Sequence, residues 1–213
     1  MSVDSKKTHL DEQPGCIRCG TCCQKGGPAL HKADRNLIVD RRIRLIDIVT
    51  FRIGEPALNP VDKSIIELPC EMIKITGISD TIWQCKFYSE EQSACLIYEH
   101  RPLECKTLKC WQPEDVASLF LKEMLCRSDL IPSDNPIWDV VKAYEKTFSI
   151  PLIAAISQQA ASGIKEADLE LKKLEQFDIR FRNKVANAFN LEFLSLNFFL
   201  GRTVKALAAT LTG

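Results

Sequence analysis

Apolar residues at helical spacing mark the last third of the chain. One apolar helix face is predicted by four residues that recur at intervals of four, three and four positions: Ile137, Val141, Tyr144 and Phe148. This helix should end before Pro151, which begins a second helix that Gly163 ends. We expect two further helices, over about residues 166–181 and 185–209, with an interruption of the last one at Gly201.

Shorter apolar runs occur in the N-terminal part. Residues 45–53 and 65–75 are rich in Ile, Val and Thr and are bounded by Gly, Pro and Asn, a pattern typical of short strands. A helix should begin near Arg101 and Pro102, because proline is tolerated at the first helical position. The predicted fold class is α+β, with a small cysteine-rich half of short strands and irregular loops followed by a mainly α-helical C-terminal half.

The composition is that of a globular protein without a strong electrostatic field. Of the 213 residues, 46% are hydrophobic and 26% are charged, which excludes a disordered or collagen-like chain. Lys plus Arg equal Asp plus Glu at 28 each, so no net charge draws the chain towards nucleic acid or anionic lipid. The most apolar stretch, residues 188–201, is interrupted by polar side chains and cannot form a membrane span. We expect a protein or redox partner, and neither nucleic acid nor membrane.

All ten cysteines lie within the first 126 residues. This asymmetry predicts a flexible polar leader over residues 1–13, a cysteine-rich metal-chelating domain over residues 14–126 and a helical region over residues 127–213. The leader lacks the apolar segment of an export signal, so we expect a cytoplasmic protein. Because thiols stay reduced in the cytoplasm, clustered cysteines there more often bind metal than form disulfides.

The strongest signal is a C-x2-C-x2-C-C cluster, which consists of Cys16, Cys19, Cys22 and Cys23. Its first part has the pitch at which bacterial ferredoxins present three thiolates to one iron–sulfur cube, and Gly20 permits a tight backbone path. The same pitch also suits a zinc knuckle. Neighbouring side chains usually point apart, so we expect Cys22 and Cys23 to serve different sites. This predicts two metal sites, or one site and a spare thiol.

Four more cysteines follow, separated by nine, nine and four residues: Cys85, Cys95, Cys105 and Cys110. Eight thiolates match two tetrahedral four-sulfur sites or two cubic clusters. Residues five apart point in different directions on a helix, so Cys105 and Cys110 can converge only if the helix ends between them. We expect Cys70 and Cys126 to be structural. His31 could supply a nitrogen ligand, but eight thiols already make a full set, so we expect it at the surface or at a helix cap.

These residues resemble the YkgJ-type cysteine-cluster proteins, which carry a zinc- or iron-chelating domain with a CxxCxxCC signature. Residues 16–23, CIRCGTCC, fit the opening motif, and residues 95–105, CLIYEHRPLEC, fit the C-x-IYE-x-RP-x-x-C block that follows it. The resemblance covers about residues 14–111 and implies that the eight cysteines of the two groups are the chelating set. Lys109 stands where many members have proline before the last cysteine, Cys110.

Flagellin lysine N-methylase looks to contain a domain related to this family, and an iron–sulfur cluster is implied for that enzyme. The resemblance therefore favours an iron–sulfur cluster over zinc, and it suggests an iron–sulfur-dependent protein-modifying enzyme as an alternative function. The sequence itself gives no support for a reaction, because it has no G-x-G nucleotide loop after a strand, no catalytic-triad signature, no P-loop and no HExxH motif. Catalytic residues and enzymatic activity stay open at this point.

Charged residues lie between two of the expected ligands. Arg101 could be the partner of a thiolate or of an anion, with Glu99 as an acid or base. Alternatively, Glu99 and Arg101 pair with each other and fix the loop that positions Cys95 and Cys105. We favour the second interpretation, because polar residues near a metal more often support its ligands.

Overall fold

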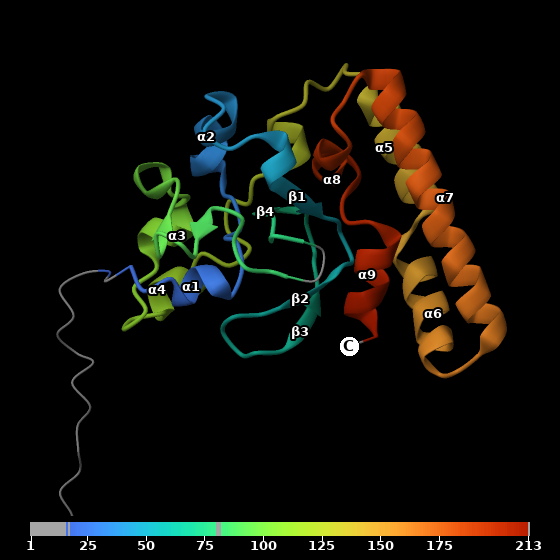
Figure 1. The fold of residues 1–213 in the computed structure, drawn as a ribbon, viewed down its shortest axis with the longest axis horizontal. Coiled ribbons are helices and arrows are strands. Elements are labelled where there is room, and N and C mark those ends of the chain that lie inside the picture. Colours follow the sequence, from blue (N-terminus) through green and yellow to red (C-terminus); the bar gives the residue numbers. More distant parts are fainter. Residues whose placement is uncertain (1–15, 17, 80–81, 213) are drawn as a thin grey trace, which may run out of the picture.

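The computed structural model describes residues 16, 18–79 and 82–212, and the leader predicted for residues 1–13 lies outside them. The described chain has an α+β fold (Figure 1). Its centre is an antiparallel pair of strands, β1 (Ile48–Phe51) and β4 (Met72–Ile75), in which Ile48 lies opposite Ile75. All four residues of β1 are buried, as expected for a strand rich in β-branched and aromatic side chains.

Two small hairpins and several short helices surround this pair. The strand β2 (Pro56–Leu58) pairs with β3 (Ile65–Glu67), and β5 (Tyr88–Ser89) pairs with β6 (Ala94–Cys95). The apolar runs therefore contain β1, β3 and β4, as predicted. The short helices are α1 (Thr21–Gln24), α2 (Arg35–Val39), α3 (Leu103–Thr107) and α4 (Glu114–Ala117), with 3₁₀ turns at Lys32–Asp34, Leu45–Asp47, Tyr98–His100 and Arg127–Asp129.

The C-terminal half is helical. It consists of α5 (Ile137–Thr147), α6 (Ile150–Ala161), α7 (Lys165–Phe189), a 3₁₀ turn at Phe193–Ser195, α8 (Leu196–Leu200) and α9 (Val204–Leu211). The predicted apolar face is confirmed, because three residues of α5 and the C-cap residue Phe148 are at most 2% exposed. In the described part of the chain, no helix combines the length and apolarity that a membrane span requires.

The longest helix differs from the prediction. Residues 166–181 and the start of the expected second helix form one continuous α7, and the predicted break between them is wrong. The segment contains neither Gly nor Pro, and Arg182 is bonded within the helix to Asp178. The helix ends instead at Asn190, which adopts a left-handed backbone conformation (φ 51°). Gly201 (φ 79°) separates α8 from α9, as expected.

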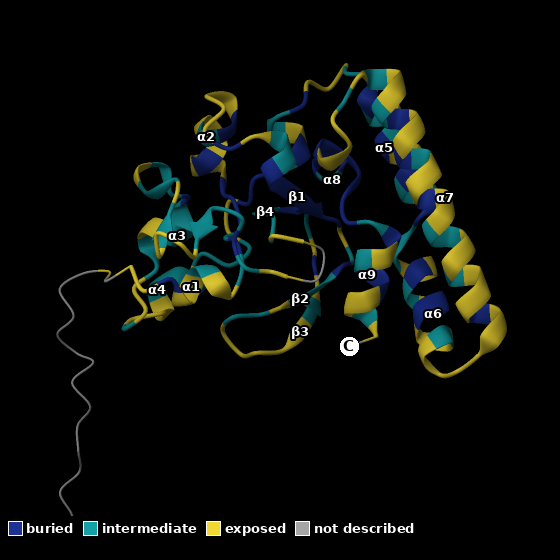
Figure 2. Cartoon of the chain, viewed as in Figure 1, coloured by how far each residue is buried: buried dark blue, intermediate teal, exposed yellow. Residues whose placement is uncertain are grey.

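One hydrophobic core joins the two halves of the sequence. It combines residues from before and after position 126, among them Leu30, Ile43, Ile73, Tyr144, Phe198 and Leu207. Figure 2 shows β1, β4 and α8 as the most buried elements, whereas the outer face of α7 is exposed. Thr50 of β1 donates a hydrogen bond to the carbonyl of Phe198 in α8 at 2.6 Å. The helical half thus packs directly on the central strands of the cysteine-rich half.

A buried ionic network fixes the helical half. Arg182 of α7 is fully buried and donates hydrogen bonds to Asp178 Oδ1 and to the hydroxyl of Tyr144, both at 2.7 Å. The same guanidinium donates to the carbonyls of Gly201 and Arg202. The other oxygen of Asp178 accepts a hydrogen bond from Val204 N at the start of α9. Three helices are therefore tied to one buried charge pair.

Candidate metal centre

All eight cysteines of the two sequence groups line one cavity of about 410 Å³. They come from the segment that precedes α1, from α1 itself, from the approach to β5, from β6, from α3 and from the loop after α3. The full set is Cys16, Cys19, Cys22, Cys23, Cys85, Cys95, Cys105 and Cys110. Cys70 and Cys126 are not among the described residues that line it. The fold thus brings together side chains that lie up to 94 residues apart in the sequence.

The first cluster is held against the second by the backbone. Cys85 N donates a hydrogen bond to the carbonyl of Cys23 at 2.7 Å, so the approach to β5 lies directly beside α1. Tyr88 of β5 pairs with Cys95 of β6, which places Cys95 on the same wall. Gly20, the N-cap of α1, has a left-handed backbone (φ 75°) and leaves room for the Tyr88 ring. A Cβ atom at Gly20 would lie 2.2 Å from the Tyr88 hydroxyl oxygen.

Replacing Gly20 by alanine should displace the cluster loop and reduce metal binding. The new Cβ collides with the Tyr88 ring, and the left-handed backbone adds a cost of about 1–2 kcal/mol for any other residue. Gly163→Ala is the matched control, since Gly163 also has a positive φ (85°) but no atom lies within 4 Å of an added Cβ. Metal content and melting temperature of both variants provide the measurement. We expect the control to lose stability only, and equal metal content in the two variants would contradict this role of Gly20.

Cys22 and Cys23 do not point apart, so the reason for assigning them to different sites does not hold, and their division between sites stays a prediction. Their Sγ atoms are 4.0 Å apart, close to the sulfur–sulfur edge of about 3.8 Å that four bonds of about 2.3 Å to a tetrahedral zinc would give. The hydrogen bond from Cys23 lowers the pKa of Cys22 to about 6, and the same interaction raises the pKa of Cys23.

The other thiols differ in burial. Cys85 is buried and Cys105 half-buried, and desolvation is the main cause that raises the pKa of each. The neighbouring thiols of Cys85, Cys95 and Cys22 raise the pKa of Cys105 further. Cys19 is exposed, and a hydrogen bond with Thr21 lowers its pKa. A bound cation would reverse the pKa elevation at the inner thiols, because it stabilises thiolates.

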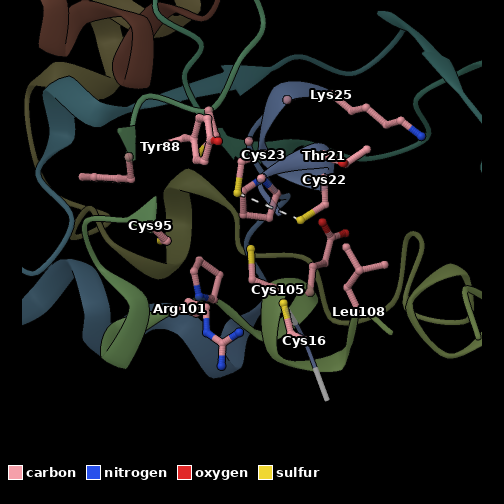
Figure 3. Close-up of a pocket in the computed structure, with 18 of the residues that line it drawn as sticks. Cys16, Thr21, Cys22, Cys23, Lys25, Tyr88, Cys95, Arg101, Cys105 and Leu108 are labelled. Carbon is pink, nitrogen blue, oxygen red and sulfur yellow. Dashed lines mark hydrogen bonds between the residues drawn. The ribbon is translucent and has the colours of Figure 1, made fainter. Parts of the chain in front are cut away.

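The end of α3 directs two of the cysteines into the cavity. The helix ends at Thr107, between Cys105 and Cys110, which confirms the geometric condition for both to face the same space. In Figure 3 the side chains of Cys16, Cys22, Cys23 and Cys105 point towards a common region. Within the described residues, no three or more His, Cys, Asp or Glu side chains already lie close enough together to hold one metal ion. The described thiols therefore line one cavity, but they do not yet surround a single metal position at bonding distance.

His31 is buried behind this cavity at the N-cap of the 3₁₀ turn Lys32–Asp34, so the predicted cap position is confirmed and the alternative at the surface is wrong. The side chain is 1% exposed, its Nδ1 lies 2.8 Å from the carbonyl oxygen of Lys122, and its Nε2 lies 3.5 Å from Glu104 Oε1. Glu104 Oε2 also accepts a hydrogen bond from Ala29 N. His31 and Glu104 together hold the start of α3, next to Cys105. The contact between His31 and Glu104 was not predicted from the sequence.

The rim of the cavity carries stacked arginines. The Cζ atoms of Arg18 and Arg101 lie 3.8 and 3.7 Å from the centroid of the Tyr98 ring. Arg101 Nε donates a hydrogen bond to the carbonyl of Tyr98 at 2.9 Å. The local ion pair of Arg101 with Glu99 is not observed in the described structure, so stacking on Tyr98 holds this loop instead.

The comparisons with known proteins agree with this arrangement. Residues 15–126, slightly more than half of the chain, match the CxxCxxCC family, whose description is "Putative zinc- or iron-chelating domain". No curated protein and no solved structure matches the chain. The match includes all ten cysteines and ends where the helical half begins. The protein therefore belongs to the CxxCxxCC family of cysteine-rich proteins, with a domain described as zinc- or iron-chelating.

Proposed function

We propose that this is a cytoplasmic metal-binding protein whose eight cavity cysteines hold one or two metal centres, with an iron–sulfur cluster preferred to zinc. One observation carries the proposal: thiols from two separate parts of the sequence line the same cavity, and both cysteines outside the two motifs lie elsewhere. If the cysteines served only as small buried side chains, there would be no reason for the motif cysteines to line the cavity and the other two to lie outside it.

The donor set fits soft metals. Thiolates select iron–sulfur clusters, zinc or Cu(I), whereas Mg²⁺ and Ca²⁺ require oxygen ligands. Glu104 is the one carboxylate among the described lining residues, and it is already bonded to Ala29 and His31. The pitch of Cys16, Cys19 and Cys22 favours iron. The short Cys22–Cys23 distance also allows both to share a centre, so eight thiols suit one large site or two smaller ones.

Metal binding should order the cysteine segments. Cys16, Cys19, Cys22 and Cys110 are exposed, whereas Cys85 is buried, so a common centre draws the outer ligands inward. Bound metal would supply either electron transfer or a structural crosslink at this place. The chain's part is to provide the sulfur ligands, to desolvate the inner ones and to position them through Gly20, Tyr88 and Glu104.

Metal analysis of protein purified without oxygen tests the proposal. We expect iron together with acid-labile sulfide, a brown colour and visible absorbance from thiolate-to-iron charge transfer. Colourless protein loaded with zinc would contradict the preference for iron, but it would still support metal binding by the thiolates. Protein that is folded but carries neither metal, even after reconstitution with iron and sulfide or with zinc, would contradict the proposal as a whole.

A second candidate is an iron–sulfur-dependent protein-modifying enzyme. The cavity favours it in one respect, because apolar side chains of Leu108, Trp111 and Val116 line it beside the thiols and its volume falls within the range of small-ligand sites. Calorimetric titration of the metal-loaded protein with S-adenosylmethionine tests the methylase version. No measurable binding would remove that version and leave the metal-binding function intact.

A further inference from the structure

The rim of the cysteine cavity is positively charged. Three cationic side chains line it, Arg18, Lys25 and Arg101, and the single carboxylate of the described lining, Glu104, faces His31 and Ala29 N. Neither arginine forms an ion pair in the described part of the chain. A protein with zero net charge thus places three cations and one carboxylate at one opening, beside the cysteine thiols.

The two arginines are held ready for a ligand. The guanidinium carbon of each arginine lies over the Tyr98 ring, a cation–π contact that holds both charges beside the cavity opening. Arg101 uses Nε on the Tyr98 carbonyl, and no described residue accepts a hydrogen bond from its two terminal nitrogens. A guanidinium edge presents two parallel N–H groups, the geometry that binds carboxylate or phosphate through two hydrogen bonds.

The fold maintains this pair at some cost. Arg18 has a left-handed backbone (φ 56°), a conformation that costs a residue with a Cβ about 1–2 kcal/mol. It lies 83 positions before Arg101, so only the folded chain brings both side chains to the same ring. A strained residue of this kind persists where the surrounding structure fixes it, often at a binding site.

We propose that the cavity rim binds an oxyanion, the carboxylate or phosphate group of a small organic molecule, between Arg18 and Arg101. Lys25 adds a third cation, and the apolar side chains of Leu108, Trp111 and Val116 accommodate the uncharged body of the ligand. The inference rests on the proposed function in placing this anion beside the metal centre. It assigns a ligand class to the open side of the same cavity.

The competing explanation is charge balance. Thiolates and a thiolate-bound cluster are negative, so the arginines could serve the ligands alone. The two explanations differ in what a lysine does. A lysine keeps the charge but loses the planar fork and most of the stacking on Tyr98. Arg101→Lys should therefore restore charge balance without restoring recognition of an oxyanion by two parallel hydrogen bonds.

Titration calorimetry of the full-length metal-loaded protein at low salt, with succinate and with inorganic phosphate as probes, tests the inference. We expect one of the two to bind, and the preferred probe identifies the carboxylate or the phosphate class. Arg18→Gln and Arg101→Gln should each weaken that binding on the order of tenfold to a hundredfold, with Arg101→Lys close to Arg101→Gln. The control is Arg180→Gln, which changes an exposed arginine on α7 that forms no ion pair or side-chain hydrogen bond within the described structure, and this variant should bind like the unmodified protein.

Metal content of the same samples separates this inference from the proposed function. Unchanged metal with weakened anion binding supports the rim site. Suppose that Arg101→Gln loses metal and that Arg101→Lys restores both the metal content and anion binding. This result would show that Arg101 only balances the charge of the thiolates, and it would overturn the inference. It is also overturned if neither probe binds, or if the glutamine variants bind as well as Arg180→Gln. A preparation that takes up no metal would refute the metal site, while the same titrations still decide the anion site.

Discussion

Cys16→Ser combined with Cys19→Ser is expected to abolish stable metal binding and to lower the melting temperature strongly. Both thiols line the shared cavity, and a serine hydroxyl is a far weaker ligand for iron or zinc than a thiolate. Metal bound to a thiolate site contributes on the order of 10–16 kcal/mol in zinc-finger peptides, more than the whole stability of many domains. Because the core is continuous across both halves, loss of the free energy of metal binding should destabilise the helices as well.

The matched control is Cys70→Ser combined with Cys126→Ser. It removes the same number of thiols, both half-buried, from outside the cavity. We expect the control to keep its metal content, with at most a modest loss of stability. Circular dichroism melting and metal analysis of the two double variants, each with and without a chelator, make the comparison. If the Cys16 and Cys19 variant keeps both its metal and its melting temperature, these residues are not ligands.

Arg182→Met is expected to lower the free energy of unfolding by about 3–5 kcal/mol, the usual cost of leaving one member of a buried ion pair without its partner. Arg182 is fully buried, and its loss removes the cation from Asp178 and five hydrogen bonds from the surrounding helices. Methionine fills a similar length, so the effect measures charge and hydrogen bonding more than volume. Urea unfolding of the metal-loaded protein provides the value.

An exposed pair on the same helix supplies the comparison. Lys172 and Asp168 have the same spacing of four residues on α7, but their side chains are 63% and 53% exposed. Lys172→Met should therefore change the free energy of unfolding by no more than about 1 kcal/mol. Equal effects of the two methionine substitutions would show that burial of the Arg182–Asp178 pair has no special role in the fold.

Local patterns predicted much of the fold. The apolar spacing of Ile137, Val141, Tyr144 and Phe148 specifies the buried face of α5, because a helix repeats every 3.6 residues whatever packs against it. The continuity of α7 was missed, although its residues include neither Gly nor Pro. Arg182 looks like a surface residue in the sequence, and its burial depends on Tyr144 and Gly201, which only the folded chain brings near.

The candidate site was predicted in its members but not in its geometry. The spacing of the cysteines and the resemblance identify the eight that line the cavity and exclude Cys70 and Cys126. The directions of Cys22 and Cys23 were predicted wrongly, because side-chain rotamers within α1 bring the two sulfurs to 4.0 Å. Long-range contacts were missed entirely, including His31 with Glu104 and Arg18 with Tyr98, since no local pattern records partners 73 and 80 positions away.

X-ray absorption at the edge of the bound metal examines the metal centre most directly, because it reports the atoms bonded to the metal. For protein purified without oxygen we expect a first coordination shell made of sulfur only, at about 2.3 Å if the metal is zinc. The amplitude should correspond to four sulfur atoms for each metal ion. A shell dominated by nitrogen or oxygen, or a sulfur shell that persists unchanged when Cys22 and Cys105 are both replaced by serine, would contradict metal binding by the cavity cysteines.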